Sequence, residues 1–302
     1  MIEKPFQGLR TFCKVSSENY PQYQYAVLGL PVDSATSYRS GTRMGPAAIR
    51  EASLMLTDGV HDRYPVDLRK HVFDLGDAAL TNGNISKMLE QIQTVISNTL
   101  AWDKHPVCLG GDHSVTLGIL RAMHARYGKL AVVHFDAHAD TSATNYDEPI
   151  GHGTWLFNAI NEGLVDPVKV ISIGIRAPAS TTTREFLNKH GGTTFTARYA
   201  YNNMDAVLSN IEHLVSDTPC YLTFDIDCLD PAHAPGTGTP EVGGFTTMWV
   251  LDCLENLPKL NWVGMDCVEV SPPYDQSEIT SIAAATVVWT YLSMVIDQKE
   301  NE

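Results

Sequence analysis

The chain has 302 residues, of which 44% are apolar and 19% charged, a balance typical of a soluble globular protein. Its 35 acidic and 21 basic side chains give a formal net charge of −14, which argues against binding to nucleic acid or to an anionic membrane surface. No segment approaches the roughly 18 consecutive apolar residues of a membrane span, and we expect neither nucleic acid nor membrane as a partner.

Short apolar runs and helical patterns alternate along the chain. In chain order, the apolar runs predict strands over residues 25–31, 72–75, 106–109, 130–135, 168–175, 220–226 and 262–270. Helical patterns between them predict helices over residues 45–53, 86–102, 115–126, 154–163, 182–189, 204–215, 247–257 and 279–296.

This alternation predicts an α/β fold. Strands joined through helices run parallel, with helices on both faces of the sheet. The strands are continuously apolar, as expected when both faces are covered. We expect about eight strands and, because no linker or charged block divides the sequence, a single domain over residues 1–302.

Six cysteines are present, at Cys13, Cys108, Cys220, Cys228, Cys253 and Cys267. None forms a CxxC pair, and a chain of this length needs no disulfides for stability. The first ten residues lack the apolar core of a secretory signal. We therefore expect reduced cysteines and a cytoplasmic protein.

Aspartate and histidine gather directly after three of the expected strands, where parallel sheets bind ligands. These segments are GGDHS at 110–114, DAHAD at 136–140 and DIDCLDP at 225–231. Side chains two residues apart share a face of an extended segment, so Asp136, His138 and Asp140 are expected to point the same way. Asp225 and Asp227 form a second such pair. Carboxylates that converge at strand ends repel one another, and divalent cations are the obvious compensation.

The donor types narrow the kind of metal site. Carboxylate oxygens with a few imidazoles and no thiolate suit Mn²⁺ or a similar divalent ion better than structural zinc. Six ligands are too many for one ion that keeps a position open, but they fit two ions bridged by carboxylates. Such a pair lowers the pKa of a bridging water, which predicts a hydrolytic reaction.

These motifs resemble those of the ureohydrolase family of arginases and agmatinases. The resemblance rests on GGDHS, DAHAD and FDIDCLDPAHAPGTGTPEVGG at 224–244, and it extends from GTRMGPAAIR at 41–50 to VEVSPPYDQSEITSIAAA at 268–285. Within the family, GHGTWLFNAINEGLVDP at 151–167 is most similar to bacterial agmatinases. The resemblance implies a three-layer α/β sandwich with a central, mainly parallel eight-stranded sheet flanked by helices.

The resemblance also implies two Mn²⁺ ions per subunit. The ligands it implies are His113, Asp136, His138, Asp140, Asp225 and Asp227. Asp136 and Asp225 would bridge the ions. His113 and Asp140 would bind the first ion, and His138 and Asp227 the second. Asp112 and Asp230 would support these ligands without binding metal.

Two further residues have counterparts in the family. Glu269 would pair with a planar guanidinium, and His152 would shuttle a proton to the leaving amine. Without the resemblance, His152 would be read as a capping or packing histidine and Glu269 as the end of a strand. The implied reaction is attack of a metal-bridging hydroxide on the guanidinium carbon, which releases urea and an amine.

The loop at 141–150 bears on the substrate. It is shorter than the arginase loop that reads the α-carboxylate of arginine, and it carries Asp147 and Glu148. Two acids would attract a terminal ammonium, although solvated loop charges account for them equally well. We expect agmatine to be cleaved to putrescine and urea. Guanidinobutyrase or another guanidino-compound ureohydrolase is the alternative, and arginase is disfavoured.

Two hypotheses from other classes remain. A zinc amidase or deacetylase shares this kind of sheet but would lack the full ligand set, and a catalytically silent relative would have lost a ligand. All six ligands are present. The resemblance further implies a homo-oligomer, either a trimer or a hexamer.

Overall fold

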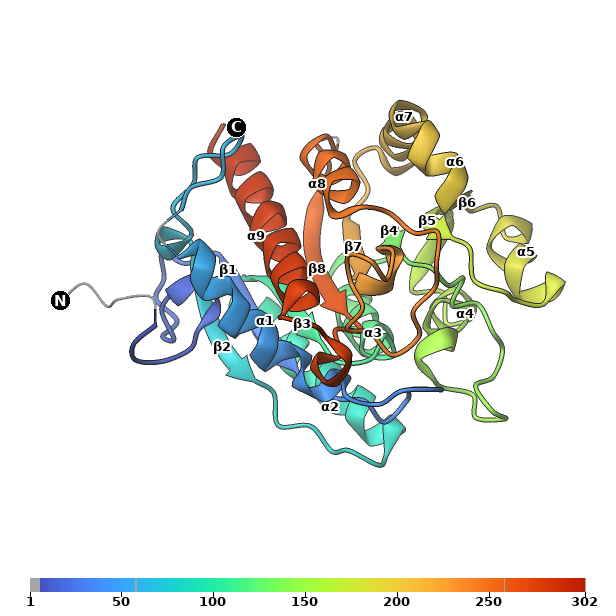
Figure 1. Ribbon diagram of the computed structural model, residues 1–302, viewed down its shortest axis with the longest axis horizontal. Helices are drawn as coiled ribbons and strands as arrows, with labels where there is room; N and C mark the ends of the chain where they lie inside the picture. Colours follow the sequence, from blue (N-terminus) through green and yellow to red (C-terminus); the bar gives the residue numbers. More distant parts are fainter. Residues whose placement is uncertain (1–5, 58, 258, 302) are drawn as a thin grey trace.

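The computed structural model describes residues 6–57, 59–257 and 259–301, built around one eight-stranded sheet (Figure 1). Its strands are β1 (Tyr25–Leu30), β2 (Val72–Asp77), β3 (His105–Gly110), β4 (Leu130–Phe135), β5 (Val165–Ile175), β6 (Thr193–Thr196), β7 (Cys220–Asp225) and β8 (Trp262–Val268). They lie in the order β2-β1-β3-β8-β7-β4-β5-β6, and every neighbouring pair is parallel. The expected α/β class and parallel eight-stranded sheet are confirmed.

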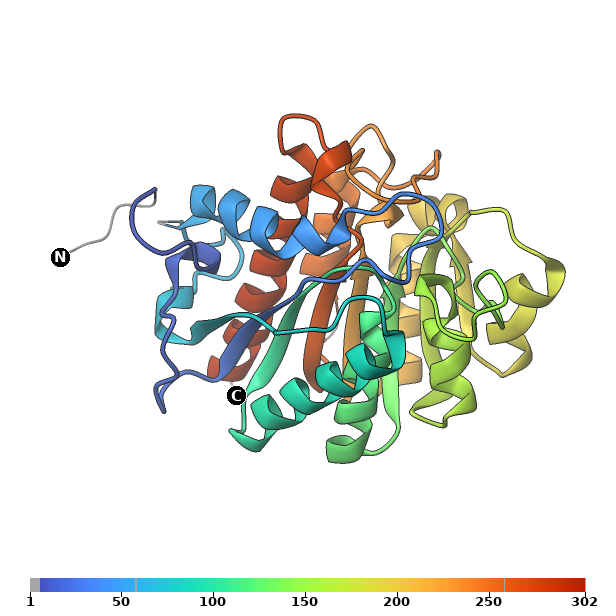
Figure 2. The same cartoon turned by 90° about the horizontal axis from the view of Figure 1, so that it is seen from below.

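Helices cover both faces of the sheet (Figure 2). They are α1 (Gly45–Ser53), α2 (Ile85–Ala101), α3 (Val115–Tyr127), α4 (Trp155–Asn161), α5 (Thr181–Lys189), α6 (Ala197–Asn202), α7 (Met204–Val215), α8 (Thr247–Glu255) and α9 (Ile279–Glu300). Side chains of α1, α6, α7, α8 and α9 join one buried apolar cluster, and those of α2, α3, α4 and α5 join the other. The helices and the sheet therefore form three layers.

Along each central strand, successive side chains pack alternately into one apolar cluster and the other. Val133 of β4 and Leu222 of β7 belong to the first cluster, whereas their neighbours Val132 and Tyr221 belong to the second. All six residues of β4 and of β7 are buried. Continuous apolar runs in the sequence thus reflect a sheet buried on both faces.

Helix α9 is the one helix in the described part of the chain that is long and apolar enough to cross a membrane. However, 78% of its most apolar 18-residue stretch is buried within the fold, beside α1 and α8. It packs as a core helix.

Two short elements were not predicted. Strand β6 and helix α6 follow each other within residues 193–202, at one edge of the sheet. The sequence of β6, TTFT, is too short and too polar to stand out as an apolar run, and its residues are only partly buried.

The strand order determines where the site lies. Strands β3, β8, β7 and β4 are consecutive in the centre of the sheet. Their carboxyl ends therefore meet at one edge, and each is followed by one of the Asp- or His-containing segments or by Glu269. In the part of the sheet formed by β2 and β1, Arg50 of α1 forms a buried ion pair with Asp74 of β2. This ion pair holds the GTRMGPAAIR segment to the sheet.

Candidate metal centre and active site

The first group of ligand atoms surrounds His113, which follows β3. Nδ1 of His113 lies 3.1 Å from Oδ2 of Asp136, 3.1 Å from Oδ2 of Asp140 and 3.0 Å from Oδ2 of Asp225. All four side chains are at most 6% exposed. Three strand ends thus supply one imidazole and three carboxylates to a single buried point.

A second group adjoins the first through Asp136. Nδ1 of His138 lies 3.1 Å from Oδ2 of Asp227 and 3.4 Å from Oδ1 of Asp136. The His138 side chain is 27% exposed, so this group is the more open of the two. Asp136 offers one oxygen to each group, as expected of a bridging ligand. Asp225 directs Oδ2 to His113 in the first group, and its Oδ1 accepts a hydrogen bond from the backbone amide of Asp227 in the second.

A hydrogen bond on the Nε2 side of the ring determines the tautomer of His113. The hydroxyl of Thr223 donates to Asp266 at 2.6 Å and can then only accept from Nε2 of His113, 2.9 Å away. This places the ring proton on Nε2 and leaves a lone pair on Nδ1. Nδ1 is buried and has no hydrogen-bond partner, although three carboxylates face it. A lone pair among carboxylate oxygens fits a cation and little else.

The electrostatics agree with this demand for positive charge. Burial lowers the pKa of His113, but its three carboxylates outweigh burial and hold the pKa well above its usual range. Burial raises the pKa of Asp225, and the like charges of Asp227 and Asp136 raise it further. Burial also raises the pKa of Asp136, but hydrogen bonds from histidines, His113 among them, outweigh burial and hold that pKa well below its usual range. The donor set, oxygens with two imidazoles and no thiolate, fits Mn²⁺ or a similar divalent ion.

The predicted ligand side chains do converge, but they do not share one face of an extended segment as expected. Asp140 has a left-handed backbone with φ of 51°, and Ile226–Cys228 form a 3-10 helix. The side chains are instead directed by turns. The Asp136 carboxylate accepts from the His138 amide at 2.6 Å, and the Asp225 carboxylate accepts from the Asp227 amide at 2.8 Å.

Glu269 and His152 form a pair next to the first group. Nδ1 of His152 lies 3.0 Å from Oε1 of Glu269, and the same oxygen accepts from the His113 amide at 2.8 Å. Oε2 of Glu269 is buried and has no partner. Glu269 has φ of 65°, a left-handed conformation that costs about 1–3 kcal/mol for a residue other than glycine. One carboxylate oxygen of Glu269 is thus without a partner beside the first group.

Sequence reasoning missed several residues that hold the ligands. His134 of β4 donates from Nε2 to Asp136 at 2.8 Å and contacts Ser172 through Nδ1. Trp155 donates from Nε1 to Asp140 at 2.7 Å and stacks on His113. Thr223 contacts Nε2 of His113, and Asp266 accepts a hydrogen bond from the Thr223 hydroxyl. One signal was available: polar residues inside otherwise apolar strands need buried partners.

A cavity of about 230 Å³ opens beside these groups. Its lining includes His113, His138, Asp140, His152 and Glu269. Asp225 lines it as well, and the rest of its wall is uncharged, with Ser37, Ala139, Ser142, Thr144, Asn145, Gly153, Ala177, Pro178, Ala179, Thr183 and Thr239. Asp147 and Glu148, which were considered as ammonium-binding residues, are exposed and do not line it.

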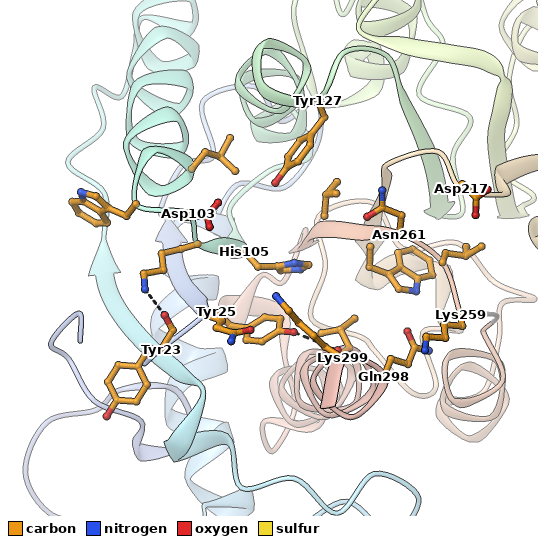
Figure 3. A pocket seen from close by; sticks show the side chains of 18 of the residues that line it. Tyr23, Tyr25, Asp103, His105, Tyr127, Asp217, Lys259, Asn261, Gln298 and Lys299 are labelled. Atoms are coloured by element: carbon orange, nitrogen blue, oxygen red, sulfur yellow. Dashed lines mark hydrogen bonds between the residues drawn. The ribbon is translucent and has the colours of Figure 1, made fainter. Parts of the chain in front are cut away.

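A larger cavity, of about 900 Å³, lies elsewhere (Figure 3). It lies at the amino ends of the strands, where it is lined by Tyr25 of β1, His105 of β3 and Trp262 of β8. The described residues contain two groups of side chains able to hold a metal, and neither lies here. Its size therefore does not make it the catalytic site.

Comparisons with known proteins agree with the geometry. A family model described as the arginase family matches residues 23–293. An agmatinase from Cronobacter sakazakii is 46% identical over 268 residues, which cover 87% of this chain and 85% of that protein. The crystal structure of a hypothetical agmatinase from Burkholderia thailandensis has a TM-score of 0.91 and 36% identity, covering 100% of this chain and 95% of the other. Proclavaminate amidino hydrolase from Streptomyces clavuligerus has a TM-score of 0.88 and 36% identity, covering 96% and 99%.

The family match spans all eight strands of the sheet and includes every predicted ligand position. It favours a ureohydrolase over a zinc amidase or a silent relative, and it identifies an enzyme that hydrolyses C–N bonds of amidines. The protein therefore belongs to the arginase family and is a ureohydrolase most like the bacterial agmatinases.

Proposed function

We propose that this protein cleaves agmatine to putrescine and urea with two Mn²⁺ ions bound at the paired ligand groups. The observation that carries the proposal is Asp136, whose two oxygens face the two groups. His113, Asp140 and Asp225 would complete one metal site. His138 and Asp227 would complete the other. When bound, two such ions polarise a water molecule for attack on the guanidinium carbon.

Glu269 would bind and orient the substrate. Its free Oε2 is buried at the cavity, so a guanidinium N–H would give this oxygen the partner it lacks. Burial raises the pKa of Glu269, and a bound cation would favour the ionised carboxylate. His152 would hold the proton that the departing amine requires.

The choice of agmatine rests on relatives and on cavity chemistry. The agmatinase of Cronobacter sakazakii shares 46% of its residues over most of both chains. Among the described residues, no lysine or arginine lines the cavity, so no such side chain would pair with the α-carboxylate of arginine or the carboxylate of 4-guanidinobutyrate. Guanidinobutyrase activity is the alternative, and arginase activity is disfavoured.

Two properties of the whole protein follow as proposals. All six cysteines are free and buried, which supports a reducing, cytoplasmic location. A homo-oligomer, trimer or hexamer, is proposed from the family resemblance alone.

The test is substrate preference. Purified protein loaded with Mn²⁺ is assayed for urea release from agmatine, arginine, 4-guanidinobutyrate and guanidine, with Asp136→Ala as the inactive control. Agmatine should give the highest kcat/KM, and the control should release no urea. A preference for another guanidine would refute agmatine but keep the ureohydrolase reaction. No urea from any substrate, with manganese bound, would refute the proposed function.

A further inference from the structure

The loop after β1, residues 33–41, reaches the active site and is fixed there. The Ala35 amide donates to Asp112 at 3.0 Å, and the Ala35 carbonyl accepts from the His152 amide at 3.1 Å. At the far end of the loop, the Gly41 amide donates to Asp33 at 3.0 Å. The loop is therefore held to Asp112 and to the backbone of His152, which lies 115 residues away from Ser37 in the chain.

Ser37 makes two contacts with Nε2 of His152. Its amide lies 3.1 Å from Nε2 and its hydroxyl lies 2.7 Å from the same atom. Nδ1 is already paired with Glu269 at 3.0 Å. Because both ring nitrogens have protein partners, His152 has no free nitrogen with which to reach a substrate directly. Ser37 lines the cavity, as His152 does, and its hydroxyl lies against Nε2.

We propose that the Ser37 hydroxyl relays the proton between Nε2 of His152 and the amine that leaves the cavity. This inference rests on the proposed function, because it assigns a route to the proton that the amine requires. In the relay, the Ser37 O–H bond breaks as its proton passes to the departing nitrogen. The Nε2–H bond breaks as its proton moves to the Ser37 oxygen. The imidazolium becomes neutral and Ser37 is restored.

The two contacts of Ser37 suit the two states of the ring. A backbone amide can only donate, so it favours neutral His152 with a lone pair on Nε2. The hydroxyl can donate to that lone pair or accept from a protonated Nε2, and it is the contact that can serve both states.

The other neighbours favour the protonated ring. Burial lowers the pKa of His152, but Glu269 outweighs burial, Asp140 and Asp112 add to its effect, and the pKa is raised to about 9. The carboxylates thus favour the protonated ring of His152, whereas the Ser37 amide favours loss of the proton from Nε2.

The experiment compares Ser37→Ala with Ser37→Thr, which keeps a hydroxyl. Ser34→Ala is the matched control, because Ser34 lies in the same loop but contacts Asn82 and Gly83 outside the cavity. Steady-state urea release is measured for each variant across pH and in mixtures of H₂O and D₂O, on the guanidine that the wild type prefers. Manganese binding by calorimetry and thermal unfolding show whether the site and the fold are intact.

Ser37→Ala should lower kcat on the order of 100-fold, with KM and manganese affinity within about threefold of the wild type. Its isotope dependence should change from several transferred protons to one. Ser37→Thr and Ser34→Ala should stay within about threefold of the wild type. If Ser37→Ala keeps the wild-type kcat, or loses rate without any change in isotope dependence, the relay is refuted although the ureohydrolase function stands. A wild type that releases no urea from any guanidine would refute both.

Discussion

Nε2 of His113 lies 2.9 Å from the hydroxyl of Thr223, and this contact decides which ring nitrogen faces the carboxylates. Thr223→Val keeps the shape of the side chain but removes the acceptor. Manganese affinity should fall about 10- to 100-fold, because the ring loses the partner that fixes its tautomer. Titration calorimetry measures the affinity, and Thr223→Ser, which keeps the hydroxyl, should bind nearly as the wild type does. Equal affinity in Thr223→Val would show that the tautomer is set by other contacts.

The buried pair of Arg50 and Asp74 should matter for stability and not for chemistry. Arg50 contacts Asp74 through two hydrogen bonds, of 2.8 and 2.9 Å, and both side chains are at most 7% exposed. Arg50→Ala leaves a buried carboxylate without its cation and should cost about 3–5 kcal/mol in the free energy of unfolding. Chemical denaturation measures this cost.

The control for that experiment is Arg126→Ala, which removes an exposed ion pair with Asp103. Its stability should match the wild type, because exposed pairs contribute little. A small effect from Arg50→Ala, similar to that of the control, would mean that the GTRMGPAAIR segment is held by packing alone.

His105 should make the fold less stable in acid. Its ring contacts the Tyr291 hydroxyl at 2.9 Å, and burial, together with nearby Lys299, lowers its pKa to about 3. In the unfolded chain the pKa of a histidine is about 6.5, so between these values the unfolded state binds a proton that the folded state does not. The free energy of unfolding should therefore fall as pH falls from about 6.5, by at most about 1.4 kcal/mol per pH unit. The ring borders an open cavity, which makes that value an upper limit.

The measurement compares the free energy of unfolding of His105→Gln with that of the wild type at several pH values between 6.5 and 4. The variant should lose less stability over this range, since it removes one site of proton uptake by the unfolded chain. Parallel curves for the two proteins would show that His105 is protonated in the folded state.

The loop acids should be dispensable for agmatine. Asp147 and Glu148 are exposed outside the cavity, whereas Asn145 lines it. Asp147→Asn combined with Glu148→Gln should leave KM for agmatine within about twofold, because exposed charges are screened by salt. Asn145→Ala should raise KM several-fold. A large rise in KM from the double variant would restore the two acids as ammonium-binding residues.

Much of this architecture could be predicted from the sequence, because burial and spacing leave strong local signals. Runs such as LAVVHF at 130–135 predicted strands covered on both faces, and helix α1 was predicted with its observed bounds. The acidic segments were placed at strand ends, and the parallel order of β3, β8, β7 and β4 brings those ends together. The eight predicted metal-binding and catalytic side chains do lie together, although their roles stay predictions.

The rest depends on contacts between distant parts of the chain. Thr223 and Asp266 look like ordinary strand residues, and only the fold shows that both stand behind His113. Ser37 meets His152 across 115 residues, through a loop whose path no local pattern records. The turns at His138 and Asp227 also escaped prediction, since in each the backbone amide donates to a ligand carboxylate, of Asp136 and Asp225 respectively.

The most direct test of the paired metal centre is to measure bound manganese and urea release on the same samples. Metal-free protein is titrated with Mn²⁺, and metal content and agmatine hydrolysis are followed together in the wild type and in Asp136→Asn. The wild type should bind two ions per chain and reach full activity only when both are bound. The variant should bind less tightly at both groups and lose activity, because Asp136 contributes an oxygen to each. Full activity with one ion per chain, or loss of a single ion in Asp136→Asn with activity retained, would contradict a centre that works as a pair.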